Sequence, residues 1–252
     1  MIVLVLAAGG ALYAWTHFPR DHTSRTSASD ALHAFRQRLK NIPLHSNQNF
    51  NLPQPGVYRY ATLGGEALDT PILSTNHEYD GVSTITVQPS PCGIDERWQV
   101  FKSRWNEGTV CYESHGTRLA SVTERHEFFG TSSSVSDRCN GGTVPPFSDM
   151  RVGMHWKTTC ASRANLTLNR STVVGFQAIA VTGEELNAVH IKSVATLEGE
   201  TSGRVERNDW RRKADGLVLR RTVTTDAHFD FVGGGHYSEH YSLMLLSSTP
   251  RR

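Results

Sequence analysis

Apolar and polar residues alternate along the C-terminal part of the chain, from residue 187 to residue 247. Between positions 226 and 231, every second residue is apolar, and the residues between them are aspartate or histidine. A period of two is typical of β-strands that bury one face and expose the other. The pattern predicts five successive strands, at Ala188–Leu197, Gly203–Lys213, Leu217–Thr225, Ala227–Val232 and His236–Leu246.

Asp215-Gly216 separates two of these strands and is a strong hairpin signal, because both central residues of a type I′ turn need a positive φ. A two-residue loop at this point places Trp210 opposite Arg221. Arg221 then intrudes on an otherwise apolar face, so we predict that this face is only partly buried. Repeated local hairpins favour an antiparallel meander over parallel βαβ units.

The first half of the chain also has strand character, but its pattern is broken in one place. Residues 130–151 are rich in Ser, Gly and Pro and predict a long loop, which in a compact domain is usually functional or disordered. Asn106-Glu107-Gly108 predicts a turn. The fold class we expect is all-β, a single antiparallel meander that forms a half-barrel, a barrel or a strongly curved sheet. Its strands are predicted at Val57–Thr62, Tyr79–Gln88, Arg97–Trp105, Thr109–Ser114, Arg118–Phe129, Met154–Ser162, Leu166–Leu168 and Val173–Val181.

Residues 2–18 contain no Asp, Glu, Lys or Arg and approach the ~20 apolar residues that cross a bilayer. We predict an uncleaved transmembrane anchor at residues 1–19; a cleaved signal peptide and a buried core helix are the alternatives. Residues 20–55 are expected to form a linker with a short amphipathic helix at Asp30–Lys40. That helix either docks on the domain, which its narrow apolar stripe favours, or lies at the membrane surface. The β domain is expected to span residues 56–252.

The four cysteines, none in a C-x-x-C spacing, predict two disulfides and an oxidising compartment. Short loops favour Cys92–Cys111 and Cys139–Cys160 among the three possible pairings. A hairpin at residues 106–108 would, however, place Cys111 opposite residues near Ser103, away from Cys92.

Charge bears on location and on partners. Basic residues follow the anchor, so the positive-inside rule predicts a cytoplasmic domain, whereas the cysteines predict an oxidising compartment. A translation start upstream of Met1 would remove this conflict. We therefore place the domain on the extracytoplasmic side of the cell membrane, held by the single-pass N-terminal helix. A net charge of +2 argues against a nucleic-acid partner.

No G-x-S-x-G, H-E-x-x-H, P-loop or G-x-G-x-x-G motif occurs, so we expect no enzyme activity and no cofactor. His126, beside Glu124 and Glu127, is a weak acid–base candidate.

The strongest candidate for chemistry is a metal site on the last hairpin. A three-residue glycine loop places His228 opposite His240, with Asp226 and Asp230 beside them on the same face. Two imidazoles and a carboxylate can hold Zn²⁺ with an open position. A two-residue loop would separate the histidines, and a merely polar, solvated hairpin is the alternative.

The N-terminal membrane signal, the long meander and the late motif Trp210-x(6)-Leu217-x-Leu219 together resemble the bacterial lipoprotein carriers of the LolA-like half-barrel family. The chain lacks the lipobox of lipidated members and carries four cysteines that the family does not explain. The resemblance implies a curved sheet that holds acyl chains in an apolar concavity, lined by Phe229, Phe231, Tyr237 and Tyr241. Alternatively, these residues fill a closed core.

Three functions follow as hypotheses. The first is a membrane-tethered module that binds a lipid or another apolar ligand. The second is a non-catalytic envelope protein that contacts an envelope partner through residues 130–151 or through a sheet edge. The third is a metal-binding protein that uses His228 and His240.

Overall fold

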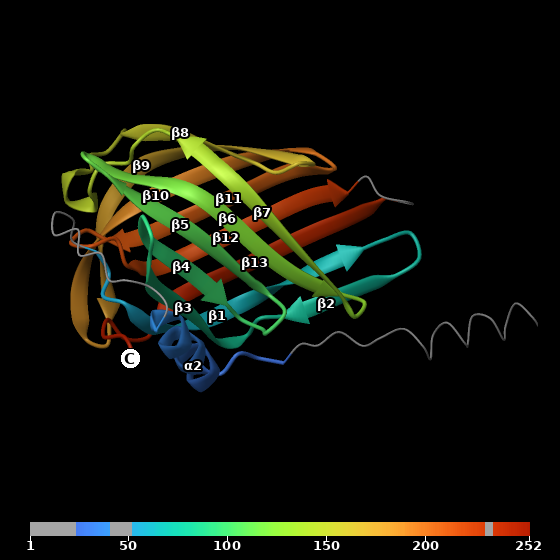
Figure 1. The fold of residues 1–252 in the computed structure, drawn as a ribbon, viewed down its shortest axis with the longest axis horizontal. Coiled ribbons are helices and arrows are strands. Elements are labelled where there is room, and N and C mark those ends of the chain that lie inside the picture. The colour runs from blue at the N-terminus through green and yellow to red at the C-terminus, as the bar shows by residue number, and fades with distance from the viewer. Residues whose placement is uncertain (1–23, 41–51, 230–233) are drawn as a thin grey trace, which may run out of the picture.

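The computed structural model describes residues 24–40, 52–229 and 234–252. These residues form one helix, α2 (Ala28–Leu39), a short 3₁₀ helix, η1 (Phe147–Asp149), and one antiparallel sheet of thirteen strands (Figure 1). The strands are β1 (Gly56–Asp69), β2 (Ser74–Glu78), β3 (Gly81–Ser90), β4 (Gly93–Gln99), β5 (Trp105–Glu113), β6 (Gly116–Phe128), β7 (Thr131–Gly141), β8 (His155–Ala161), β9 (Asn165–Val181), β10 (Glu184–Gly199), β11 (Thr201–Arg212), β12 (Val218–Phe229) and β13 (Gly235–Leu245).

The sheet closes on itself because β13 pairs with β1, from Tyr60↔Leu245 to Asp69↔His236. Twelve strands, β1 and β3 to β13, make an antiparallel barrel, and β2 pairs with the second half of β1 beyond the reach of β3. Closure leaves no unpaired edge on the first and last strands. The predicted all-β antiparallel meander is confirmed, and of the three expected forms it is the closed barrel.

The barrel encloses a core of inward-facing residues from both halves of the chain. Trp98 of β4 is fully buried and stacks on Tyr241 of β13, with ring centroids 4.4 Å apart. At the left-hand end of Figure 1, the β9–β10 hairpin curls over the barrel, and its buried Ile179, Val181 and Leu186 join the same core. Burying one such large side chain contributes about 2–3 kcal/mol, so this end of the barrel is a conventional packed interior.

Helix α2 docks on the outside of the barrel against β1 and β3, as the docking alternative predicted. Its N-terminus has a capping box, in which Asp30 N donates to Ser27 Oγ (3.0 Å) and Ser27 N donates to the Asp30 carboxylate (3.3 Å). Ala31 and Phe35 are buried and pack against Val57. Among the described residues, no helix is long and apolar enough to cross a membrane, and the predicted anchor lies outside them.

Several strand predictions are wrong. Leu166–Leu168 and Val173–Val181, expected as separate strands, are parts of one continuous strand, β9. Leu217–Thr225 and Ala227–Val232 were expected as separate strands, but β12 runs unbroken to Phe229, since no turn residue interrupts it. Residues 131–141, expected in a loop, form β7; their small polar side chains suit an exposed strand held between β6 and β8. Asn106-Glu107-Gly108 lies inside β5, and the chain turns before Trp105 instead.

The Asp215-Gly216 turn is longer than the two residues predicted. Gly216 N donates to Arg212 O (2.7 Å), and the Asp215 carboxylate holds the Arg212 guanidinium. A bulge between Trp210 and Arg211 shifts the register, so Trp210 pairs with Arg220 rather than with Arg221. Arg221 therefore faces the interior with 4% exposure, where we had expected a partly buried face.

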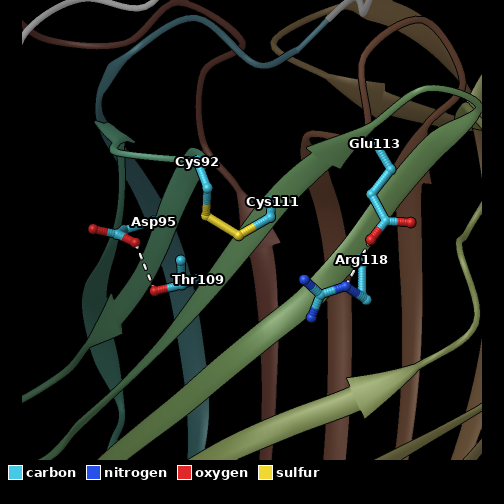
Figure 2. The surroundings of a disulfide bond; sticks show 6 residues. All are labelled: Cys92, Asp95, Thr109, Cys111, Glu113 and Arg118. Carbon is cyan, nitrogen blue, oxygen red and sulfur yellow. Dashed lines mark hydrogen bonds and ion pairs between the residues drawn. A yellow bond between two sulfur atoms is a disulfide. The ribbon is translucent and has the colours of Figure 1, made fainter.

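Both disulfides form between the cysteines that short loops favoured, Cys92 with Cys111 and Cys139 with Cys160. Figure 2 shows the first, which joins the β3–β4 turn to β5 beside the Asp95–Thr109 hydrogen bond. Cys111 pairs with Gly93 rather than with residues near Ser103, because β5 begins earlier than the predicted turn allowed. The second joins directly opposed residues of β7 and β8 and fixes β7 in the sheet.

Candidate functional site

Aromatic side chains gather at the end of the barrel opposite the β9–β10 hairpin. This is the right-hand end in Figure 1, where β1 and β12 end. β1, β6, β10 and β12 end here and β13 begins here, because neighbouring strands run in opposite directions. Some members of this group are buried (Leu68, Ala227, Tyr237) and others are partly exposed (Phe128, Phe129, Leu197, Phe229); we call the group the mouth cluster.

Beneath the mouth cluster lies a buried carboxylate, Glu66 of β1, with a fully buried side chain. Its oxygens accept hydrogen bonds from Tyr237 Oη (3.0 Å) and lie 3.0 Å from the Nδ1 atoms of His77 and His126. Arg104 Nε lies 3.4 Å from Glu66 Oε2 and binds Glu239 through Nη2 at 2.7 Å. Tyr79 Oη donates to the same Glu239 oxygen (2.8 Å). We call these residues the Glu66 network (Glu66, His77, Tyr79, Arg104, His126, Tyr237, Glu239).

The protonation of the Glu66 network follows from these contacts. Burial would raise the pKa of Glu66, but hydrogen bonds from His126 and His77 and the charge of Arg104 outweigh it and hold that pKa well below its usual range. Burial and Arg104 act to lower the pKa of His126, yet hydrogen bonds to Glu124 and Glu66 leave it raised above 6.5. At neutral pH, Glu66 is therefore a carboxylate that favours the protonated form of His126.

A second group of charges crosses the barrel closer to its middle. Glu96 of β4 binds Arg211 of β11 (2.8 Å) and Arg221 of β12 (3.1 Å), and Arg221 also binds Asp209 Oδ1 at 2.5 Å. Arg207 Nε lies 3.2 Å from Asp209 Oδ2. β4 is not a hydrogen-bonded neighbour of β11 or β12, so these ion pairs span the interior. They leave no continuous apolar channel along the barrel axis among the described residues, because a chain of ion pairs lies across it.

The predicted ligand-binding residues separate into two places. Phe229 and Tyr237 meet in the mouth cluster, with ring centroids 6.3 Å apart. Tyr241 lies deeper, 2% exposed, and fills the core against Trp98. Phe231 lies outside the described residues. Any apolar site that uses the predicted residues is thus confined to the mouth.

The predicted pairing of His228 with His240 is wrong. β12 and β13 pair with Phe229 opposite Gly235, which leaves residues 230–234 as the connection and sets His228 opposite His236. His240 lies opposite Thr224, whose Oγ1 is 3.1 Å from its Nδ1. Asp226 shares a face with His228, and Asp230 lies outside the described residues. A glycine loop longer than the three residues assumed accounts for the error.

The weak acid–base candidate has a different set of partners from those expected. His126 contacts Glu66 at 3.0 Å and Glu124 only at 3.8 Å. Glu66, His77, Arg104 and Glu239 were not predicted from the sequence, because no local motif marks them and Arg104 lies 135 residues from Glu239. The one available signal was Glu239, which interrupts an apolar face.

Comparisons with known proteins identify no family for this chain. No protein-family model matches the chain, so the resemblance to the lipoprotein carriers receives no support from them. No curated protein matches either. Among solved structures, the chain is similar to the crystal structure of the hypothetical lipoprotein YmcC from Escherichia coli (K12), with 11% identity, a TM-score of 0.38, and coverage of 90% of this chain and 100% of that one.

Proposed function

We propose that this protein is a membrane-anchored, extracytoplasmic binding module whose barrel mouth takes the apolar part of a small ligand such as a lipid. One observation carries the proposal: the partly exposed aromatic mouth cluster at the only barrel end that the β9–β10 hairpin does not cover in the described structure. Mouths of β-barrels are common places for small-molecule sites. Two disulfides are typical of extracytoplasmic proteins.

The backbone at the mouth supports a role for the aromatic rings. Phe129 occupies the β6–β7 turn with φ 53°, a left-handed conformation that Gly or Asn adopts more easily. Holding a bulky residue there costs on the order of 1 kcal/mol or more. Its ring joins the mouth cluster, so the strain keeps an apolar side chain where a small polar turn residue would be more stable.

The depth of the site is limited by the charges beneath it. The Glu66 network and the ion pairs of Glu96 cross the interior, and separating such buried pairs costs several kcal/mol. A ligand therefore contacts Phe128, Phe129 and Phe229 and stops at Tyr237. A shallow aromatic site suits the end of an acyl chain or a single ring rather than a whole lipid enclosed in the barrel.

The test combines co-purification with a matched pair of variants. We expect native mass spectrometry of protein extracted from membranes to show a bound lipid, and a fluorescent fatty acid to bind the purified protein. Phe229→Ser should weaken that binding about tenfold, equivalent to ~1.4 kcal/mol. Phe176→Ser, at a ring 45% exposed on the outer wall of β9, should leave it unchanged. Equal affinity in wild type and Phe229→Ser, or absence of any bound probe, contradicts the proposal.

A second candidate function is an envelope interaction through the outer wall. Residues of β9, β10 and β11 line an open groove of about 650 Å³, and its lining includes the exposed Leu168 and Val174 together with Arg170 and Lys192. Exposed apolar patches rimmed by charge are typical of protein contacts. A photo-crosslinker at position 174 should then capture an envelope protein that the same crosslinker at Val135, an equally exposed position on β7, does not capture.

A further inference from the structure

Two histidines and an aspartate converge on the outer face of β12 and β13, beside the mouth. His228 and His236 are directly paired across the strands, and their ring centroids lie 4.9 Å apart at an interplanar angle of 35°. Asp226 lies two residues before His228, so its side chain leaves the same face of β12. One ligand atom from each of the three residues lies within 4.8 Å of the other two. We call these residues the rim triad.

The distances in the rim triad suit a small metal ion. His236 Nε2 lies 3.4 Å from Asp226 Oδ1, and His228 Nε2 lies 3.9 Å from the same oxygen. Tetrahedral Zn²⁺ with bonds of about 2.0–2.1 Å needs its ligand atoms ~3.3 Å apart. The side chains of Asp226 and His228 are 67% and 63% exposed, so small rotations can reach that spacing without disturbing the core.

The charges around Asp226 leave its carboxylate available. Its cross-strand neighbour on β11 is Arg204, whose guanidinium binds Glu206 at 2.7 Å. On the other side, Asp226 pairs with Ser238, which carries no charge. Imidazole nitrogen together with carboxylate oxygen is a ligand set for zinc and neighbouring transition metals rather than for calcium or magnesium.

We propose that Asp226, His228 and His236 bind one Zn²⁺ ion, with a fourth coordination position open to solvent. Backbone pairing fixes both histidine Cα positions, so the site is largely formed before the metal arrives. The open position allows a water or a donor atom from a second molecule to complete the tetrahedron. This proposal does not depend on lipid binding at the mouth, because the rim triad faces outward and the mouth cluster faces the barrel interior.

His240 provides a matched control for the rim triad. It lies four residues after His236 on the same outer face of β13, is exposed, and bonds to Thr224 rather than to the triad. Removing it takes away one exposed imidazole from the same strand while leaving all three proposed ligands. A nonspecific histidine effect would therefore appear in His240→Asn as well.

The experiment is equilibrium dialysis of the untagged full chain against zinc chloride, with cobalt chloride absorption spectra to report coordination geometry. Wild type should bind zinc and show the intense visible bands of tetrahedral Co²⁺. His228→Asn and His236→Asn should each raise the dissociation constant at least ~tenfold and abolish those bands, while His240→Asn should match wild type.

Three results would overturn the site: no zinc bound by wild type, unchanged affinity in His228→Asn, or an equal loss in His240→Asn. Circular dichroism checks that each variant is folded. His228→Asn is the primary test, because the His228 side chain is the more exposed of the two.

Discussion

Glu66 is the residue on which most of the buried polar contacts at the mouth converge. Its two oxygens meet side chains from β2 and β13, which pair with β1, and from β6, which is not a neighbour of β1 in the sheet, so one carboxylate joins separate parts of the barrel wall. Removing one member of such a network leaves the others buried without a partner, which is costlier than losing a single hydrogen bond. The network therefore fixes the relative positions of the strands beneath the mouth.

His126 makes the stability of this network dependent on pH. Its pKa in the folded protein is raised above the unfolded value of 6.5, so its contribution is fully present below pH 6.5 and is lost as pH rises through the folded pKa. We expect the free energy of unfolding, measured in urea, to fall as the pH rises above 6.5. His126→Gln should flatten this fall, and His240→Gln on the exterior should not. An identical slope in wild type and His126→Gln would contradict the role of His126.

In acidic solution the free energy of unfolding depends on pH in the opposite direction and falls as the pH falls. The pKa of Glu66 is lowered in the folded state, so its contribution is present above its ordinary value of 4.5 and is lost as pH falls through the folded pKa. The pKa of Asp209 is lowered in the same direction, because Arg221, Arg207 and Arg211 outweigh the opposing effect of burial. Both carboxylates thus favour the folded state in mildly acidic solution, where His126 is also charged.

At the scale of elements, helix α2 depends on a single large contact. Phe35 is 2% exposed and packs against Val57 on the outside of the barrel. Phe35→Ala should weaken the docking of α2 by about 3 kcal/mol. Hydrogen exchange of the α2 amides should then accelerate by about two orders of magnitude. Phe176→Ala, which truncates a half-exposed ring on β9, should leave exchange in α2 as it is in wild type; equal acceleration in both variants would contradict specific docking.

The sequence predicts the positions of the strands better than the register between them. The alternation of apolar and polar residues predicted β10, β11 and β13, because this alternation depends only on which face of a strand is buried. It failed for β7, whose serines are exposed on both sides and therefore do not alternate. The register of the last hairpin depends on the length of a glycine connection, and a wrong length exchanged His236 for His240.

The residues of the candidate site were likewise predicted only where a local pattern in the sequence marks them. Phe229 and Tyr237 were found because they repeat every second residue on a buried face, whereas Glu66 and Arg104 were missed. Glu66 meets His126 and Tyr237 from 60 and 171 residues away, and Arg104 meets Glu239 from 135 residues away. Only the closed sheet brings these pairs together. No local pattern in the sequence carries that information.

At the scale of the whole molecule, the barrel depends on the close approach of β1 and β13. Gly64 has φ +116°, and a Cβ atom at this position would lie 2.0 Å from the backbone oxygen of His240. Gly64→Ala should therefore destabilise the fold by more than ~3 kcal/mol in urea unfolding, since the clash is with backbone and the φ is strained for alanine. Gly175→Ala, where a Cβ meets nothing within 4 Å, is the control and should change stability by less than ~1 kcal/mol. Comparable losses would show that the β1–β13 contact is not tight.

Val57 and Arg251 exchange two backbone hydrogen bonds, at 2.9 and 3.0 Å, so the first strand is held by residues at the far C-terminus. A ribosome makes Arg251 after all the strands of the described barrel. Until β13 and Arg251 have been made, β1 exposes unpaired backbone groups that can pair with another β-strand. A chain interrupted before its final strand should consequently be cleared or aggregate rather than persist as a shorter working protein.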